Sequence, residues 1–540
     1  MQVLKRNPCG RLWLSMLLVT SIYLTCAAGP PPPPASARPS SAKSEGPLAL
    51  FSVTVRPDGT WAGEGLVTFP IPSPAPSAQR EGLDGQVRRE AAAIFRDFDV
   101  RHTWTETKSS PHVLTYTLSI EGDDASEITE AALQAGYAVE RLSGPVTLEL
   151  RGAIRAGQTM TITLPGNPST GYSWEVETLG GTALSQAGDV ETRQVARGLG
   201  VPAQQVIRLW AVETGQTGFR LAYRRAWETE RSPKVAISID ADGLDLAHIC
   251  AILSTELLAH ASAARAQDEH PQRRSPAPEQ TDPHSSLQSL PEVYNWCETH
   301  GGCPPVRNQG RCGSCWAFGT VGPLEAWIKY GGAEGNVDLA EQYLLSCNTH
   351  GWGCDGGWWA HDYHWNMMPP GEPQAGAVLE SAFPYQASEV SCAGPYDHPF
   401  KVTSWDYIGD GHSVPAVAAI KEAIHTFGPV GVAVCVGNQF DRYTGGVFQT
   451  DETCNYAVNH AVVLVGWDDA DQAWILRNSW GPDWGEDGYM RIRYGTSNVG
   501  YAANYVVYTP AAAPERVYYY LPVVIGSIIP PSYRACPAHQ

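Results

Sequence analysis

The spacing of apolar residues along the first quarter of the chain changes between two periods. Apolar and polar residues alternate over 51–55 and over 114–120, which predicts half-buried strands. Apolar residues recur at helical spacing over 83–98, and a second helix is expected over 125–135. We therefore expect residues 48–143 to form a small α+β domain, in which the sequence shows no recognisable chemistry.

From residue 146 to about residue 240, apolar residues occupy every second position. The segments with this pattern are 146–150, 160–164, 206–212, 219–223 and 235–239. Six or so short strands in under a hundred residues predict a β-sandwich over residues 144–240. Residues 241–289 are expected to be a linker or pro-segment, because a stretch compatible with an apolar helix (244–258) is followed by a polar, proline-rich one.

The first 28 residues have the three-part pattern of a secretory signal: basic residues, an apolar run and small residues. The apolar run is shorter than the roughly 20 residues that a membrane-spanning helix needs. Cys26 offers an alternative, lipidation, which would attach the chain to a membrane, although Tyr23 and Thr25 fit poorly before a lipidated cysteine. We expect cleavage of the signal, and therefore a secreted or cell-surface protein.

Composition narrows the choice of partners. The net charge of −19 and the isoelectric point near 5.2 argue against a protein that binds nucleic acid or anionic membranes. Thirteen cysteines in an exported chain indicate disulfides, and they gather in the C-terminal half. Residues 29–47 are a Pro/Ser-rich spacer, and the role of the C-terminal tail, residues 511–540, stays open.

Candidate catalytic residues occur in three motifs of the C-terminal half. Gln309 and Cys315 belong to a motif that places the cysteine at the start of a helix, where the helix dipole favours the thiolate. His460 follows 145 residues after Cys315 (460 − 315), and an Asn-Ser-Trp-Gly motif begins at Asn478. Imidazole would take the thiol proton, Asn478 would orient the ring, and Trp480 would shield their hydrogen bond from water.

Each of these residues also has a structural interpretation. A lone cysteine in a secreted protein is usually half of a disulfide, and a lone histidine before an apolar run is usually a core residue. Neither interpretation explains why Gln309, Cys315, His460 and Asn478 occur together in this order. The Gln309 amide and the Cys315 backbone N–H would complete the site as donors to an oxyanion.

Through these motifs, residues 290–510 closely resemble the papain-like cysteine peptidase family. The resemblance implies a two-lobed α+β fold with a cleft between the lobes, and cysteine endopeptidase activity on peptide or protein substrates, with no cofactor and no metal. It also implies a set of substrate-binding residues, with Gly357 opposite the substrate backbone and hydrophobic walls around it: Gly357, Trp358, Ala433, Val458 and Trp480.

The family's disulfide framework is matched in part. The resemblance implies the pairs Cys312–Cys354 and Cys347–Cys392. Cys454 stands where the family's third bridge begins, but its usual partner region, residues 498–504, has no cysteine. We predict that Cys454 pairs with Cys435, the nearest alternative, and that Cys297–Cys303 is an added local bridge. The states of Cys250 and Cys536 stay open.

Three segments of the predicted sandwich carry loop motifs that are ordinary turn chemistry when each is taken alone. They are Asn167-Pro168-Ser169-Thr170-Gly171-Tyr172, Gly198-Leu199-Gly200 and Arg225-Ala226-Trp227. In this order they resemble the chagasin family, immunoglobulin-like inhibitors of papain-like peptidases. The resemblance implies that three adjacent loops plug a peptidase cleft, with the Asn-Pro loop nearest the nucleophile. Ala226 replaces the family's usual proline, and the middle loop has fewer glycines.

No long helical prosegment of the common papain type precedes Leu290, so we expect the sandwich to hold the peptidase latent through an intramolecular contact. That contact should bury residues 167–172 near Cys315 and pack Trp227 against Trp480. Three alternatives stay open: an exopeptidase whose loop 365–377 blocks one end of the cleft, an inactive peptidase fold that only binds, and a sandwich that serves as a spacer or a carbohydrate-binding module.

Overall fold

The computed structural model describes residues 48–56, 60–70, 101–110, 113–122, 146–228, 235–247, 250, 290–330 and 337–509. All of them lie in one compact unit that spans residues 46–540. The predictions for the signal, the spacer, the two N-terminal helices, Cys536 and the tail concern residues outside this set. The predicted linker, 241–289, is described only at 241–247 and 250, and its predicted start is wrong: a strand continues to Asp245, and Leu246 and Cys250 are buried in a hydrophobic core. Within the described set, every helix is too short or too polar to span a bilayer.

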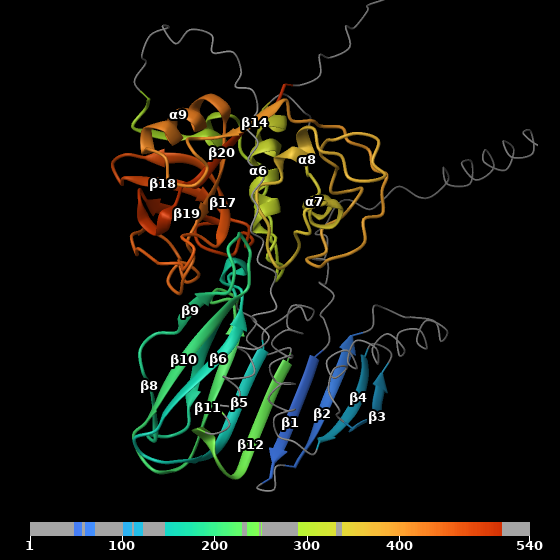
Figure 1. Ribbon diagram of the computed structural model, residues 1–540, viewed down its shortest axis with the longest axis vertical. Helices are drawn as coiled ribbons and strands as arrows, with labels where there is room; N and C mark the ends of the chain where they lie inside the picture. The colour runs from blue at the N-terminus through green and yellow to red at the C-terminus, as the bar shows by residue number, and fades with distance from the viewer. Residues whose placement is uncertain are drawn as a thin grey trace, which may run out of the picture. The chain divides into compact units, whose positions relative to one another are not determined.

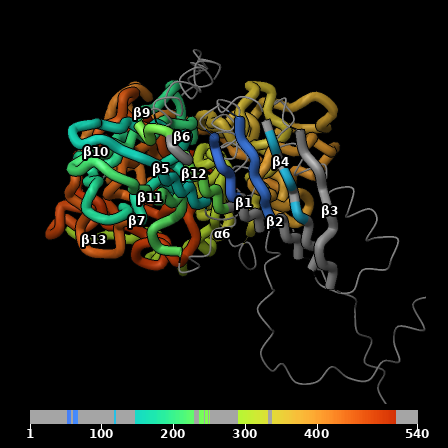
Figure 2. The backbone as a smooth tube through the Cα atoms, turned by 90° about the horizontal axis from the view of Figure 1, so that it is seen from below, coloured from blue at the N-terminus to red at the C-terminus, as the bar shows by residue number. Residues whose placement is uncertain are grey.

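One eight-stranded sheet contains strands from both predicted N-terminal domains. Its members are β1 (Leu48–Val55), β2 (Trp61–Pro70), β3 (Arg101–Ser110), β4 (Val113–Gly122), β5 (Val146–Ile154), β7 (Ser173–Leu179), β11 (Gly215–Arg224) and β12 (Val235–Asp245). The order is β3-β4-β2-β1-β12-β5-β11-β7, and β1 pairs with β12 in parallel. Figure 1 shows β11, β5, β12, β1, β2, β4 and β3 side by side, and Figure 2 shows β1, β2 and β4 continuing the sheet beyond β12.

A second sheet packs against the β5-β11-β7 part of the first. It contains β6 (Thr159–Gly166), β8 (Leu184–Gln186), β9 (Glu191–Gln194) and β10 (Ala203–Ala211), with β10 paired to the other three. Alternate side chains of both sheets meet in one core, for example Leu148 and Leu150 of β5 with Ile162 of β6 and Leu209 of β10. The alternating segments therefore do form strands, and residues 146–245 are called the sandwich below.

The predicted boundary near residue 143 does not separate two cores. Val53, Val55 and Trp61 are buried in the same core as the sandwich strands. Seven residues of β1 pair with β12, from Ala49 opposite Val235 onward. The described part of the region 48–143 is therefore an extension of the sandwich sheet, because the free edge of β12 offered backbone groups that β1 satisfies.

Residues 290–509, called the C-terminal domain below, contain two cores. The helices are α5 (Trp296–Thr299), α6 (Cys315–Tyr330), α7 (Glu341–Cys347), α8 (His361–Trp365) and α9 (Val417–Phe427). The strands are β13 (Val293–Asn295), β14 (Ser404–Tyr407), β15 (Val430–Val434), β16 (Val447–Phe448), β17 (His460–Asp468), β18 (Ala473–Arg477), β19 (Tyr489–Arg493) and β20 (Tyr501–Val507). One core gathers α6, α7 and the segments after them, and the other fills the space between the sheet and α9. This division matches the two lobes expected from the sequence.

Helix α6 packs closely against β17, which places the candidate nucleophile beside the candidate base. Two glycines make this approach feasible. A Cβ atom at Gly319 would lie 3.1 Å from Ala461, and one at Gly322 would lie 3.1 Å from Val463. Both neighbours belong to β17, so a larger residue at either glycine would push the helix away from the strand.

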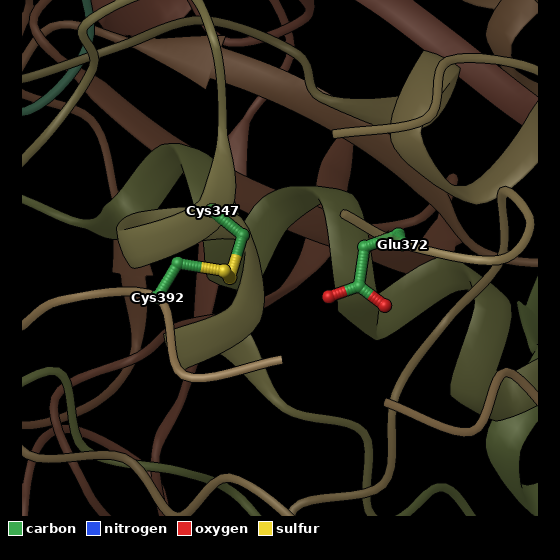
Figure 3. A group of neighbouring side chains, drawn as sticks. All are labelled: Cys347, Glu372 and Cys392. Carbon is green, nitrogen blue, oxygen red and sulfur yellow. A yellow bond between two sulfur atoms is a disulfide. The ribbon is translucent and has the colours of Figure 1, made fainter. Parts of the chain in front are cut away.

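Four disulfides staple the C-terminal domain, and all four predicted pairs are confirmed: Cys297–Cys303, Cys312–Cys354, Cys347–Cys392 and Cys435–Cys454. Cys250 and Cys315 belong to none of these four bridges, and both are buried. Figure 3 shows that Glu372 lies near the Cys347–Cys392 bridge. Both sulfurs of this trio are consumed by the disulfide, and the Glu372 carboxylate accepts hydrogen bonds from the backbone N–H of Tyr396 and from His398 Nε2, so the trio is structural.

Candidate active site

Cys315 is the first residue of α6 and is fully buried. The turn before it is fixed by two hydrogen bonds, from Gly313 N to Cys354 O at 2.8 Å and between Ser314 Oγ and Tyr385 Oη at 2.5 Å. Burial raises the pKa of the Cys315 thiol to about 12, although hydrogen bonds from the Ala461 backbone and the Ser169 side chain act in the opposite direction. The thiol is therefore protonated at neutral pH in this arrangement.

His460 is the first residue of β17, and its imidazole is held from two sides. Nε2 lies 2.8 Å from Asn478 Oδ1, and the indole of Trp480 stacks on the ring with 5.0 Å between centroids. Since an amide oxygen only accepts, Nε2 carries the proton and Nδ1 is the free lone pair. Nδ1 is buried and has no hydrogen-bond partner among the described residues. Burial lowers the pKa of His460 to about 4.

Gln309 is fixed by the residue that follows Asn478. Its backbone N–H donates to Ser479 O at 2.8 Å, and its Oε1 accepts from Ser479 Oγ at 2.7 Å. These bonds orient the amide so that Nε2 faces the turn before Cys315, where it donates to Cys312 O at 2.9 Å. The structure thus brings together the turn around Gln309, the start of α6 and the segment after β18.

The loop Asn167–Tyr172 of the sandwich covers Cys315. Its centre is a short 3₁₀ helix, Pro168–Thr170, and all of its residues are buried. The Ser169 side chain hydrogen-bonds the Cys315 thiol, and Ser169 O accepts from Trp480 Nε1 at 2.8 Å. Asn167 Nδ2 donates to Gly200 O at 2.7 Å and so ties this loop to the next one.

The middle loop pairs with the C-terminal domain through backbone atoms. Leu199 N donates to Gly357 O at 3.1 Å, and Gly357 N donates to Leu199 O at 2.9 Å, which is an antiparallel bridge. Gly200 N donates to Asn459 O at 2.8 Å. The Leu199 side chain is fully buried in a cluster that includes three predicted substrate-binding residues: Trp358, Ala433 and Val458.

The third loop supplies a buried cation and an aromatic ring. Arg225 is 1% exposed, and its guanidinium donates to Thr170 O, Asn308 Oδ1 and Gly310 O at 2.9–3.0 Å. Trp227 stacks on Trp480 with 5.4 Å between ring centroids. The two predicted contacts, burial of the Asn-Pro loop at Cys315 and stacking of Trp227 on Trp480, are both confirmed.

The thiolate–imidazolium pair expected from the sequence is absent from this arrangement. The thiol has a pKa of about 12 and the imidazole a pKa of about 4, so both groups are neutral at pH 7. The largest cause of each shift is desolvation, and the sandwich loops contribute to it by covering the site. The structure describes a closed site whose charge separation is suppressed.

Sequence reasoning missed several residues at this contact. Ser169 lies inside the Asn167–Tyr172 loop, which the sequence analysis did identify, so its place in that loop could have predicted a contact with Cys315. No motif marks the other missed residues, which act through their placement in the folded chain: Ser173, Gln194, Asn438 and Asp441.

Comparisons with known proteins found matches for two parts of the chain. Residues 290–509 match the family described as papain family cysteine protease, and residues 153–240 match the one described as chagasin family peptidase inhibitor I42. Cysteine endopeptidase RepA of Oryza sativa subsp. japonica is 38% identical over 220 residues, which cover 39% of this chain and 54% of that protein. Chymopapain of Carica papaya is 32% identical over 222 residues, 40% of this chain and 58% of that protein.

Oryzain beta chain, also of Oryza sativa subsp. japonica, is 36% identical over 214 residues, 39% of this chain and 43% of that protein. The chain thus spans about half the length of the curated relatives it matches. Among solved structures, digestive procathepsin L2 proteinase from Tenebrio molitor larval midgut is 31% identical, with a TM-score of 0.36 and coverage of 41% of this chain and 70% of that one.

Proposed function

We propose that the C-terminal domain, which belongs to the papain family of cysteine proteases, is a cysteine endopeptidase, and that the sandwich, which contains a chagasin family domain, keeps it latent in the same chain. The observation that carries the proposal is the covered site. Loops of one domain lie on the candidate nucleophile, base and subsites of the other, as Ser169, Leu199 and Trp227 show.

Peptide hydrolysis by the open domain follows from the positions of the side chains. His460 Nδ1 accepts the proton of Cys315 Sγ, and the thiolate attacks the carbonyl carbon of the peptide. The Cys315 N–H and Gln309 Nε2 donate to the oxyanion, and the imidazolium returns its proton to the leaving amine. The acyl part of the substrate is then joined to Cys315 Sγ as a thioester. Water, deprotonated by His460, hydrolyses this thioester and releases Cys315. Asn478 keeps the ring in the tautomer that this sequence of steps requires.

The middle loop also supports a substrate class. Leu199 bonds to Gly357 in the way an extended peptide would add a strand, and its side chain enters the apolar cluster at Trp358, Ala433 and Val458. A substrate that takes its place would present a hydrophobic residue to the same cluster. We therefore expect protein or peptide substrates with a hydrophobic second residue before the cleaved bond.

Four disulfides support an oxidising location, in agreement with the secretory signal expected from the sequence. Secretion or display at the cell surface belongs to the proposal. Detection of the chain in the culture medium, with cleavage near residue 28 measured by intact mass, would test it.

Gly200→Ala in the full chain tests latency. Gly200 has a φ of +80°, and a Cβ atom there would lie 1.8 Å from Gly313 O, so the middle loop cannot stay in the cleft. Gly188→Ala is the matched control, since Gly188 also has a φ of +80° but has nothing within 4 Å of its Cβ position. We expect Gly200→Ala to raise the rate of Cys315 alkylation and of peptide hydrolysis by about a hundredfold or more, and Gly188→Ala to leave both unchanged.

The outcomes separate the two parts of the proposal. If the unaltered chain and Gly200→Ala hydrolyse a peptide at the same high rate, the peptidase stands and latency fails. If Gly200→Ala exposes Cys315 to alkylation but hydrolyses no peptide, latency of the thiol stands and the peptidase assignment fails.

A further inference from the structure

The sandwich touches the C-terminal domain at a second place, outside the three loops. The segment closed by the Cys435–Cys454 bridge, called the disulfide loop below, faces β7 and β9. In this bridge Cys454 pairs with Cys435 and not with the usual partner region of the family framework. The disulfide loop lies before Val458 and the base His460, and it carries none of the proposed catalytic residues.

The disulfide loop is internally braced. The Glu452 carboxylate accepts hydrogen bonds from the backbone N–H groups of Gly437, Gln439 and Phe440 at 2.6–3.4 Å. Tyr443 Oη donates to Gly446 O at 2.5 Å. A braced loop presents its side chains without a large loss of conformational entropy on contact, which favours binding.

Asn438 and Asp441 are the contact residues of the disulfide loop. Asn438 Nδ2 donates to Val190 O, and Asn438 Oδ1 accepts from Thr192 Oγ1 at 3.5 Å. Asp441 Oδ2 accepts from Ser173 Oγ at 2.7 Å, and the Asp441 side chain is buried by the contact and its surroundings. Each of these bonds joins the sandwich to the C-terminal domain.

Two further contacts surround this pair. Gln194 donates from Nε2 to Val458 O at 3.0 Å and accepts at Oε1 from Tyr456 N at 3.4 Å. One amide side chain thus hydrogen-bonds two backbone groups just after the disulfide loop. Arg442 lies 4.0 Å from Glu175 and places opposite charges across the contact. The polar groups on the two sides are therefore complementary.

We propose that the disulfide loop is an exosite for the sandwich of the same chain: a second docking surface, beside the catalytic cleft and without catalytic residues, that makes the inhibitory domain selective for its own peptidase. The proposal rests on the proposed latency. Donors and acceptors at Asn438 and Asp441 are properties of this loop and of no catalytic motif, so a peptidase with a different loop offers the sandwich the cleft contact alone. The exosite adds to a cleft contact in which Ala226 replaces the family's usual proline.

Asn438→Asp in the full chain tests the exosite. The substitution keeps the size of the side chain but turns a carboxylate oxygen toward Val190 O, where the amide donated. Gln439→Glu is the matched control, because it makes the same chemical change on the next residue, which is exposed. Loss of the hydrogen bond with an unpaired acceptor left behind should raise the rate of Cys315 alkylation by about tenfold to a hundredfold over Gln439→Glu.

A second variant approaches the exosite from the sandwich. Ser173→Ala removes the donor to Asp441 and leaves the peptidase sequence unaltered. We expect alkylation of Cys315 about threefold to tenfold faster than in Ser185→Ala, a control on an exposed position of β8. In chains that also carry Gly200→Ala, Asn438→Asp should leave kcat/KM unchanged, because Asn438 is none of the proposed catalytic or substrate-binding residues and its partners here lie in the sandwich.

The results distinguish the exosite from latency itself. If Gly200→Ala is alkylated rapidly while Asn438→Asp and Ser173→Ala behave like their controls, the exosite is overturned and latency stands. If the unaltered chain is already alkylated as rapidly as Gly200→Ala, both proposals fail. If Asn438→Asp lowers kcat/KM in the Gly200→Ala chain, the loop belongs to the peptidase site and the exosite is overturned.

Discussion

The C-terminal domain and the sandwich meet at one site but contribute to it in different ways. The C-terminal domain supplies side chains with specific chemistry, a thiol, an imidazole and two amides, at the ends of α6, β17 and β18. The sandwich supplies mainly backbone groups and shape: Leu199 and Gly200 bind through N–H and C=O, and Ser169 accepts through its carbonyl. The proposed function of the C-terminal domain therefore depends on particular reactive atoms. That of the sandwich depends on whether its loops match the shape of the cleft.

The largest effect on peptide hydrolysis should come from removing the sulfur atom of Cys315. In the open Gly200→Ala chain, Cys315→Ala should lower kcat/KM for peptide hydrolysis by about 10⁴-fold or more, because no other group can form the acyl-enzyme. His460→Ala should be nearly as damaging, and Asn478→Ala less so, since Asn478 orients the ring and transfers no proton. A fluorogenic peptide assay measures all three.

Cys250→Ala provides the matched control for the thiol. Cys250 is the other buried cysteine of the described residues outside the four disulfides, and it packs in the sandwich with its sulfur 3.8 Å from Met160 Sδ. Unchanged hydrolysis in Cys250→Ala with loss in Cys315→Ala assigns the nucleophile. Equal activity of Cys315→Ala and its parent chain would remove the mechanism.

A smaller but still large effect is expected at Arg225, a buried charged residue of the sandwich. The Arg225 guanidinium bonds across the contact to Asn308 Oδ1 and Gly310 O, and burial lowers its pKa. Arg225→Met should weaken the closed state by about 3 kcal/mol, or more than a hundredfold in Cys315 alkylation, because buried charged hydrogen bonds are among the costliest to lose. Arg220→Met, on the exposed face of β11, is the control. Identical rates of Cys315 alkylation in the two variants would show that the charge of Arg225 does not contribute to holding the sandwich on the cleft.

The same contrast explains what could be predicted from sequence. In the C-terminal domain, Cys315, His460 and Asn478 could be recognised from sequence motifs, because few residue types can act as nucleophile, base or orienting amide. The four disulfides followed from the resemblance and from local spacing. In the sandwich, the alternating strands were predictable, but the pairing of β1 with β12 was not. Alternation of apolar and polar residues shows that a strand has one buried face, but it does not show which neighbouring strand it pairs with.

The exosite contacts were invisible for a related reason. Asn438 and Ser173 are common surface residues, and nothing in their neighbourhoods marks them as partners. They meet because the loops at the cleft fix the orientation of the sandwich, which brings β7 and β9 to the disulfide loop. The thiolate–imidazolium pair was expected for the open peptidase; in the closed site, burial raises the pKa of Cys315 and lowers that of His460, which opposes the pair.

The smallest expected effect is a pH dependence of closure through Asp441. In the closed chain its carboxyl is buried, Oδ1 has no hydrogen-bond partner among the described residues, and burial raises its pKa to about 7. The Ser173 hydroxyl and Arg442 act in the opposite direction, whereas Glu452 and Glu175 raise the pKa further. Removal of the sandwich exposes the carboxyl and lowers its pKa toward the ordinary value of about 3.9.

The sign follows from proton binding. Between pH 4 and pH 7 the closed state holds a proton on Asp441 that the open state releases, so closure is strongest in acid and weakens as pH rises. The change stays far below the limit of tenfold per pH unit, because Glu452 of the same loop also raises the pKa of Asp441 in the open state. Above about pH 7 both states are ionised and the dependence ends. Cys315 alkylation, measured from pH 4 to pH 8 and divided by the rate for the open Gly200→Ala chain, should rise by about tenfold in the unaltered chain and in Asp397→Asn, an exposed control. In Asp441→Asn the ratio should be flat; a rise of the same size there would place the titrating group elsewhere.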